Sequence, residues 1–219
     1  MRRALPLLLG LCLGLPAAAT EGPGCGAPTE YLQSAPLPAT ATGNRYLLCM
    51  EVGFEHRLPE SGDAVKIGMV DLADGDKWIE LGESRAWSWQ QGCMLQWRPG
   101  SAREVLWNDR DGDRFVSRVL DVKTRKLRTL PRPVGHLSPD GKLALCEDYS
   151  RIWNFRAGYG YAGIPDPYAA QPAPAEIGVW RMDLETGQSR LLVSVADLVK
   201  IPYPGQAPAD QPYITHLSW

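Results

Sequence analysis

A repeated hairpin motif constrains the fold of this chain more than any other feature of its sequence. Each copy has an apolar stretch that ends in aspartate, then a polar turn, then a second apolar stretch. The copies are IGMVDLADGDKWIEL from Ile67, SRVLDVKTRKLRTL from Ser117 and VWRMDLETGQSRLLV from Val179. Because alternating apolar residues flank turn residues that tolerate positive φ, each copy predicts a β-hairpin.

The aspartate before each turn has an expected structural role. An aspartate at this place accepts hydrogen bonds from backbone amides two residues further on, and these bonds fix the bend. We therefore interpret Asp71, Asp121 and Asp183 as turn-forming residues.

A second hairpin precedes each of the two later copies. LQWRPG (95–100) leads into EVLW (104–107), and HLSPDGKLAL (136–145) holds a strand, a P-D-G turn and another strand. The aspartates of the repeat are 50 and then 62 residues apart, and the longer interval contains an insertion at 156–176. Four strands in about 40 to 50 residues predict a blade of a β-propeller, so the expected fold class is all-β.

The two ends of the chain carry different signals. Residues 1–19 join a basic start to the apolar run LPLLLGLCLGL and a run of alanines, which predicts a secretory signal peptide. Residues 20–44 form a Pro-rich lead-in, and residues 45–219 hold the blades. The last residues, PYITHLSW, repeat the form of an inner strand, so we expect about three and a half blades of a ring of six to eight. A complete four-bladed propeller is the alternative.

Several motifs resemble those of known propellers. S-P-D-G-K at 138–142 and V-D-L at 70–72 are similar to motifs of the TolB-like and Trp-Asp-repeat group, and the chain also resembles the secreted enzyme oligogalacturonate lyase. WQQGCMLQW (89–97), WNDR (107–110) and YGYAGIPDP (159–167) are similar to strings in uncharacterised secreted propellers. The resemblance implies either a binding domain without catalysis or an enzyme that performs β-elimination on uronate oligosaccharides.

A Trp-rich stretch, RAWSWQQGCMLQW (85–97), is the first candidate binding segment. Continuous alternation along it would place its tryptophans on one side of an inner strand. One interpretation is that they fill the space between blades. The other is that the loop 84–91 lies at a rim of the channel, where aromatic faces and amides bind a sugar. The candidate residues are Trp87, Trp89, Gln90 and Gln91.

The insertion and the histidines supply the other candidates. Tyr159 and Tyr161 lie in the long insertion, which either covers the channel mouth as a ligand-binding segment or packs on a neighbouring blade or second copy. His216 lies in T-H-L-S-W, and His136 occupies the matching place one blade earlier. Under the lyase hypothesis His216 is the catalytic candidate and His136 a ligand contact; otherwise the pair caps turns of the repeat.

The sequence predicts no metal site of its own. N-D-R-D-G-D (108–113) resembles a calcium loop, but the Gly and Glu of an EF-hand are missing, so a hairpin turn is the better interpretation. Cys49, Cys93 and Cys146 lie in apolar runs typical of buried thiols, while export would permit disulfides that include Cys25. A divalent metal enters only under the lyase hypothesis.

Composition and charge limit the kinds of partner that we expect for this chain. A net charge of -2 gives no reason to expect nucleic acid, and no long apolar run follows residue 19, so we expect no membrane span in the mature chain. The sequence thus predicts a secreted or periplasmic propeller that binds an oligosaccharide or a protein through its channel face. A carbohydrate-active enzyme of the oligogalacturonate-lyase type is the alternative, and whether the chain is an enzyme stays open.

Overall fold

The computed structural model describes residues 29–31, 45–201 and 212–219. Strands account for 39% of these described residues and helices for 7%, which agrees with the all-β prediction. The strands form three antiparallel sheets, each built from four strands in sequence order. The predicted signal peptide and Cys25 lie outside the described residues.

The bounds of the elements follow the repeat. The first sheet comprises β1 to β4, at Thr29–Tyr31, Tyr46–Val52, Val65–Asp71 and Lys77–Ser84. The second comprises β5 to β8, at Gln96–Trp97, Glu104–Asp111, Arg114–Asp121 and Leu127–Leu130. The third comprises β9 to β12, at His136–Leu137, Leu143–Cys146, Gly178–Asp183 and Ser189–Ser194. Two short helices, α1 (Tyr149–Phe155) and α2 (Val195–Leu198), belong to the third unit.

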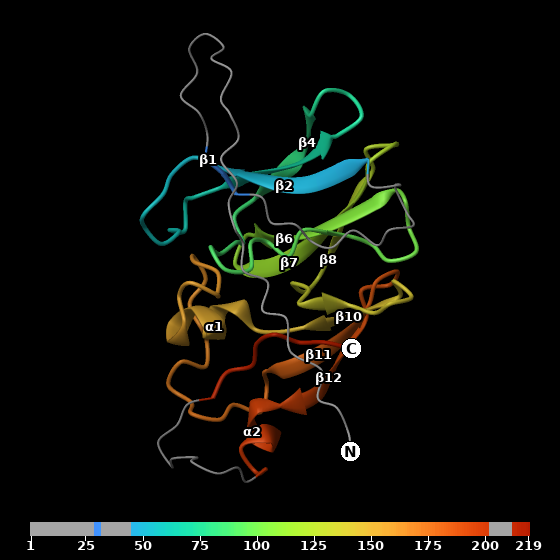
Figure 1. The fold of residues 1–219 in the computed structure, drawn as a ribbon. Coiled ribbons are helices and arrows are strands. Elements are labelled where there is room, and N and C mark those ends of the chain that lie inside the picture. Colours follow the sequence, from blue (N-terminus) through green and yellow to red (C-terminus); the bar gives the residue numbers. More distant parts are fainter. Residues whose placement is uncertain (1–28, 32–44, 202–211) are drawn as a thin grey trace, which may run out of the picture.

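The sheets stack in chain order, from β1–β4 through β5–β8 to β9–β12 (Figure 1). The middle sheet is buried on both faces because the first sheet packs on one face and the third sheet on the other. Successive side chains of a strand point to opposite sides, so neighbouring residues enter different cores. On β6, Val105 and Trp107 belong to the core shared with the first sheet. Leu106, between them, belongs to the core shared with the third sheet. Two apolar layers therefore hold the three sheets together.

The hairpin motifs fold as predicted. Asp71 accepts a hydrogen bond from the amide of Ala73 at 3.1 Å, and Asp121 accepts one from Lys123 at 2.9 Å. Asp183 accepts one from the amide of Glu185 at 2.9 Å. The structural role of the three aspartates is confirmed.

The calcium-like segment is also a hairpin. β6 ends at Asp111 and β7 begins at Arg114, so Gly112 and Asp113 form the two-residue turn. Gly112 has φ of 61°, a value that glycine adopts without strain. The hairpin interpretation of N-D-R-D-G-D is therefore confirmed.

Three local predictions differ from the structure. Residues 85–95 do not continue as a strand, because Gly92 and Met94 have φ near +58° and +55° and a bridge between Ser88 and Gly92 closes a turn there. The lead-in contributes β1, so Tyr46–Val52 is the second strand of its sheet. Residues 212–219, expected as an inner strand, have no regular secondary structure.

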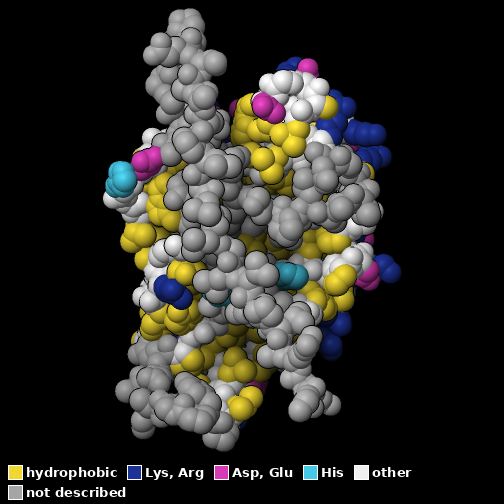
Figure 2. Space-filling model, viewed as in Figure 1, with side chains coloured by type: hydrophobic (Ala, Val, Ile, Leu, Met, Phe, Trp, Pro, Cys, Tyr) yellow, Lys and Arg dark blue, Asp and Glu magenta, His cyan; other side chains and the backbone are white. Residues whose placement is uncertain are grey.

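The next observations concern the charged and hydrophobic side chains on one face of the protein and the length of its helices. On the face drawn in Figure 2, most of the described Lys and Arg side chains lie along one edge, and hydrophobic side chains are frequent among the other described residues. Within the described ranges, no helix has the length and apolar character needed to cross a bilayer.

Candidate functional site

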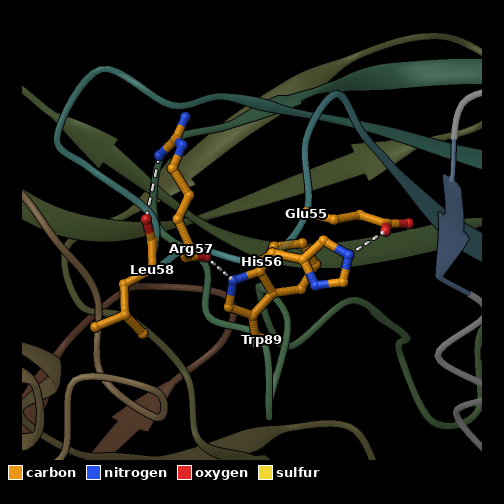
Figure 3. Close-up of a pocket in the computed structure, with 5 residues that line it drawn as sticks. All are labelled: Glu55, His56, Arg57, Leu58 and Trp89. Carbon is orange, nitrogen blue, oxygen red and sulfur yellow. Dashed lines mark hydrogen bonds and ion pairs between the residues drawn. The ribbon is translucent and has the colours of Figure 1, made fainter.

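A hollow of about 500 Å³ lies where two loops of the first and second units meet. The loop between β2 and β3 contributes Glu55, His56, Arg57 and Leu58, and the turn before β5 contributes Trp89 (Figure 3). This volume is in the range of small-molecule sites. The hollow therefore brings one residue of the predicted Trp-rich segment together with a charged loop that the sequence analysis had not singled out.

Aromatic packing fixes Trp89 in the wall of the hollow. Its ring meets the ring of Trp87 nearly edge-on, with centroids 5.1 Å apart, and it meets Phe54 in the same way at 5.7 Å. Its indole nitrogen donates a hydrogen bond of 2.6 Å to the carbonyl of Arg57. Because the ring is held on several sides, its orientation is set before any ligand arrives.

Arg57 lines the hollow, but its guanidinium makes its contacts within its own loop. Its guanidinium makes two hydrogen bonds to Asp63, of 2.5 and 2.9 Å, and it lies 3.5 Å from the centroid of the Phe54 ring. The hydrogen bonds from Arg57 lower the pKa of Asp63. Because Asp63 pairs with this guanidinium, the positive charge of Arg57 attracts an anionic ligand only weakly.

Glu55 and His56 supply the polar groups at the mouth. The Nε2 atom of His56 lies 3.3 Å from a carboxylate oxygen of Glu55, and 92% of the His56 side chain is exposed. His56 also has φ of 62°, a left-handed conformation that few residues other than glycine adopt. Leu58 is exposed as well. The hollow thus combines an indole, an aliphatic side chain, a carboxylate and an imidazole.

The other residues of the Trp-rich segment have different environments. Trp87 is buried, and its indole nitrogen donates to the carbonyl of Asp63 at 3.1 Å, which leaves no face of the ring for a ligand. Gln90 is exposed but does not line the hollow. The side-chain oxygen of Gln91 is buried and has no hydrogen-bond partner. Only Trp89 of the four candidates lines the hollow.

A second set of predicted residues meets near the end of α1. The rings of Tyr159 and His216 are in contact, with centroids 5.6 Å apart. The guanidinium carbon of Arg156 lies 3.8 Å from the centroid of the Tyr159 ring. His216 and Tyr159 are 57 residues apart in the sequence, so only the fold brings them together.

Tyr161 and His136 do not join this cluster. Tyr161 is fully buried, with its ring stacked on Tyr149 at 3.9 Å, and its hydroxyl accepts a hydrogen bond from Asn108 at 3.0 Å. The prediction that Tyr161 covers a channel mouth does not fit this burial, because the aromatic rings around it form a core. His136 is exposed on β9, and its carbonyl accepts a hydrogen bond from the indole of Trp219 at 3.3 Å.

The sequence analysis did not single out two buried ionisable residues, Glu147 and Arg151. One carboxylate oxygen of Glu147 is buried without a hydrogen-bond partner, and burial raises the pKa of Glu147 to about 7. Arg151 on α1 is fully buried and is paired with Asp166 at 3.2 Å. Both follow β10 in the stretch C-E-D-Y-S-R, whose charges in an otherwise apolar region were the available clue.

The cysteines behave as predicted for buried thiols. Cys49, Cys93 and Cys146 are all buried, and burial raises the pKa of Cys146 to about 12. Cys93 packs against the sulfur of Met50 at 3.4 Å. In the part of the chain that the structure describes, no three His, Cys, Asp or Glu side chains are grouped to hold a metal ion.

Comparison with known proteins adds no relative: no family model matches, and neither a curated protein nor a solved structure is significantly similar to the chain. No activity can therefore be transferred from a relative. Function has to follow from the residues and the geometry of the two clusters, around Trp89 and around Tyr159.

Proposed function

We propose that the three sheets are consecutive blades of an exported β-propeller, similar to the TolB-like group, whose activity is the binding of a ligand. The support is the order of the strands: each unit is a four-stranded antiparallel meander, and neighbouring units stack face to face (Figure 1). The turn aspartate recurs with the same hydrogen bond in each unit, which supports the same repeat.

The ligand that best fits the hollow at Trp89 is a neutral carbohydrate. A sugar ring has an apolar face that packs on an indole and hydroxyls that bond to carboxylate and imidazole groups. Trp89, Glu55 and His56 supply these groups within one hollow. This combination is the observation that carries the proposal.

Charge separates a neutral sugar from an acidic one at this site. The cation nearest the hollow, Arg57, is bonded to Asp63, and Glu55 adds a negative charge at the mouth. A uronate would therefore be repelled by Glu55 without a free cation to offset the repulsion. The hollow favours an uncharged oligosaccharide over an anionic one.

Replacing Trp89 with alanine should weaken binding of a neutral oligosaccharide by about tenfold or more, since a buried tryptophan contact often dominates a binding site. We would measure dissociation constants by calorimetry across a panel of neutral oligosaccharides. Leu58→Ala, which removes an exposed side chain of the same hollow, should give a smaller loss.

Trp219→Ala is the control, because Trp219 is an exposed tryptophan that lies beside β9 and does not line the hollow. It should bind the same sugars as the unaltered protein. Equal losses in the Trp89 and Trp219 variants, or no binding of any neutral sugar by a folded protein, would remove the hollow as a carbohydrate site.

The second candidate function is the lyase activity, and one observation favours it. β-Elimination needs a base close to the uronate. The exposed imidazole of His216 contacts the ring of Tyr159, a residue of the insertion. We would incubate the protein with oligogalacturonides and a divalent metal and follow the ultraviolet absorbance of unsaturated uronates. An increase that His216→Ala abolishes, while His136→Ala retains it, would support the lyase; no increase would reject it.

A further inference from the structure

The C-terminal segment, residues 212–219, lies beside the third sheet and is not paired with it as a strand (Figure 1). Among the described residues, no hydrogen bond between backbone groups joins this segment to another part of the chain. A segment held mainly by side chains can open locally without unfolding the sheet. The side-chain contacts are Tyr213 stacked on Phe155, His216 against Tyr159, and the indole of Trp219 bonded to the carbonyl of His136.

The segment has a firm attachment at its first residue. The carbonyl of Pro212 accepts a hydrogen bond of 3.0 Å from the buried side chain of Arg151. Further along, His216 has φ of 59°, a left-handed conformation that costs free energy for a residue with a side chain. Detachment of residues 213–219 relieves this strain while Pro212 stays in place, so the segment can open about Pro212.

A buried carboxyl lies against the segment. Glu147 is 5% exposed, and one of its side-chain oxygens is buried without a hydrogen-bond partner. The position that a Cβ atom would take at Gly135 is 3.5 Å from the carboxyl carbon of Glu147 and 3.4 Å from a methyl group of Leu217. The hydroxyl oxygen of Thr215 is also buried without a partner. The segment therefore helps to exclude water from Glu147, and unpaired polar atoms occur on both sides of the contact.

Among the described residues, no cation pairs with Glu147, whose polar contact is to the hydroxyl of Tyr149. Ionisation of this carboxyl is therefore unfavourable as long as the carboxyl is covered. The other ionisable side chains near it belong to several elements and form no ion pair with it. They are Cys146 on β10, Asp148 before α1, Tyr161 in the insertion, Arg132 before β9 and His216 in the C-terminal segment.

We propose that the C-terminal segment is a pH-sensitive strap, which stays on the third sheet while Glu147 is protonated and detaches when Glu147 ionises. Detachment lets water reach the carboxylate, so the free energy of solvating this charge drives the opening. Opening also separates His216 from Tyr159 and frees the carbonyl of His136, on the edge of β9, from its bond to Trp219. The proposal does not depend on the ligand of the hollow.

The size of the effect follows from the two environments of the carboxyl. Burial raises the pKa of Glu147 to about 7, and exposure to water returns this pKa toward its ordinary value of 4.5. Below pH 4.5 the carboxyl is protonated in both states and favours neither. As the pH rises from 4.5 to about 7, ionisation increasingly favours the detached state. Because each pKa unit changes an equilibrium tenfold, the whole change is about 300-fold.

Fluorine NMR of the protein labelled with 5-fluorotryptophan would follow the strap, with Trp219→Phe to assign its resonance among the eight tryptophans. The measurement uses a His136→Gln background, because titration of this exposed imidazole beside Trp219 would also move the resonance. We expect a docked resonance at pH 5 that moves toward free 5-fluorotryptophan by pH 8. Between these pH values the ratio of docked to detached protein should fall roughly fiftyfold.

Glu147→Gln should keep the Trp219 resonance docked at both pH values, because glutamine has the shape of the protonated carboxyl and does not ionise. Glu80→Gln, at an exposed position on β4, is the control and should keep the whole change. Leu217→Ala removes a contact of the segment, so detachment should begin at a lower pH than in the unaltered protein.

Two further variants test the other ionisable groups beside the strap. Asp148→Asn keeps a side chain that caps α1, and His216→Asn keeps a side chain that tolerates the left-handed backbone. Both variants should retain the movement of the Trp219 resonance, because Glu147 is still present to ionise.

Several results would overturn the proposal. They are a Trp219 resonance that stays docked at pH 8 in the unaltered protein, a movement that persists in Glu147→Gln, or its loss in Asp148→Asn or His216→Asn. Circular dichroism would verify the fold of each variant. If Glu147→Gln did not fold, Leu217→Ala would decide: an unchanged pH of detachment would reject the strap, and a lower pH would support it.

Discussion

Replacing Glu147 with glutamine should make the protein more stable than the unaltered chain at pH 8, by about 3 kcal/mol. The reason is the pKa of this carboxyl, which burial raises to about 7 from 4.5. A shift of this size corresponds to ~1.4 kcal/mol for each pKa unit. Glutamine keeps the shape of the protonated carboxyl and never becomes charged.

The direction of the pH dependence follows from the raised pKa. Below pH 4.5 the carboxyl is protonated in both the folded and the unfolded chain, so its contribution to stability is fully present. Between pH 4.5 and about 7 the unfolded chain loses the proton first, and the folded state loses stability progressively. Above this window the loss is complete.

Urea unfolding at pH 5 and pH 8 would measure the effect. The fall in the free energy of unfolding between the two pH values should be smaller in Glu147→Gln than in the unaltered protein. Glu80→Gln, at an exposed position on β4, is the control and should leave the fall unchanged. Asp148, whose pKa burial also raises, contributes in the same direction, so the variant should keep a remaining slope. An identical fall in Glu147→Gln would contradict the expectation.

The surroundings of Glu147 explain why this carboxyl is so sensitive. Its carboxyl carbon and the side chain of Leu217 both pack against Gly135. One oxygen lacks a partner, and the nearby polar groups are the hydroxyls of Tyr149 and Tyr161, whose pKa values burial raises. Since no cation pairs with Glu147 among the described residues, the charged form is stabilised only weakly.

Local patterns predicted the repeat because the information needed for it lies within a few residues. The turn after Asp183 needs only this aspartate and the amides that follow it, and Gly187 adopts the positive φ that the turn requires. The same holds for Asp71 and Asp121. Hairpin positions, and with them the all-β class, could therefore be read from the sequence.

The candidate sites depend on contacts between distant residues, and these the sequence did not predict. The left-handed backbone at Met94 prevents residues 85–95 from continuing as the expected strand. A loop about thirty residues earlier then supplies the carbonyl of Arg57, which accepts a hydrogen bond from the indole of Trp89. Alternation treated Trp87 and Trp89 alike, yet one is buried and the other lines the hollow. Periodicity predicts which side of a strand a side chain faces. It does not predict the direction of a side chain where the chain turns.

Replacing Arg151 with methionine should lower the free energy of unfolding by about 3 to 5 kcal/mol, the largest loss we expect from one substitution. The side chain of Arg151 is 2% exposed and that of its partner Asp166 is fully buried. Without the guanidinium, Asp166 becomes a buried charge that only hydrogen bonds stabilise, from the amide of Tyr168 and more weakly from Asn154. Burying an unpaired charge is among the most costly changes in a protein.

Arg151 also joins three segments, so its loss should have a local effect besides the global one. Its guanidinium donates to Pro212 in the C-terminal segment and to the carbonyls of Tyr168, Gln171 and Pro172 in the insertion. In Arg151→Met these carbonyls lose their donors, and the insertion should become more sensitive to limited proteolysis. Hydrogen exchange at residues 157–172 should increase in parallel.

A double-mutant cycle separates the ion pair from the other contacts. Asp166→Asn in the Arg151→Met background removes the unpaired charge and should recover part of the stability, so the two losses are not additive. Arg103→Met is the matched control, because the Arg103–Asp121 pair is more exposed and should cost less than about 1 kcal/mol. If urea unfolding gave similar small losses for Arg151→Met and Arg103→Met, the buried pair would have no special role. A large loss confined to Arg151→Met would instead mean that the insertion and the C-terminal segment, which carry Tyr159 and His216, are held in place by this one buried cation.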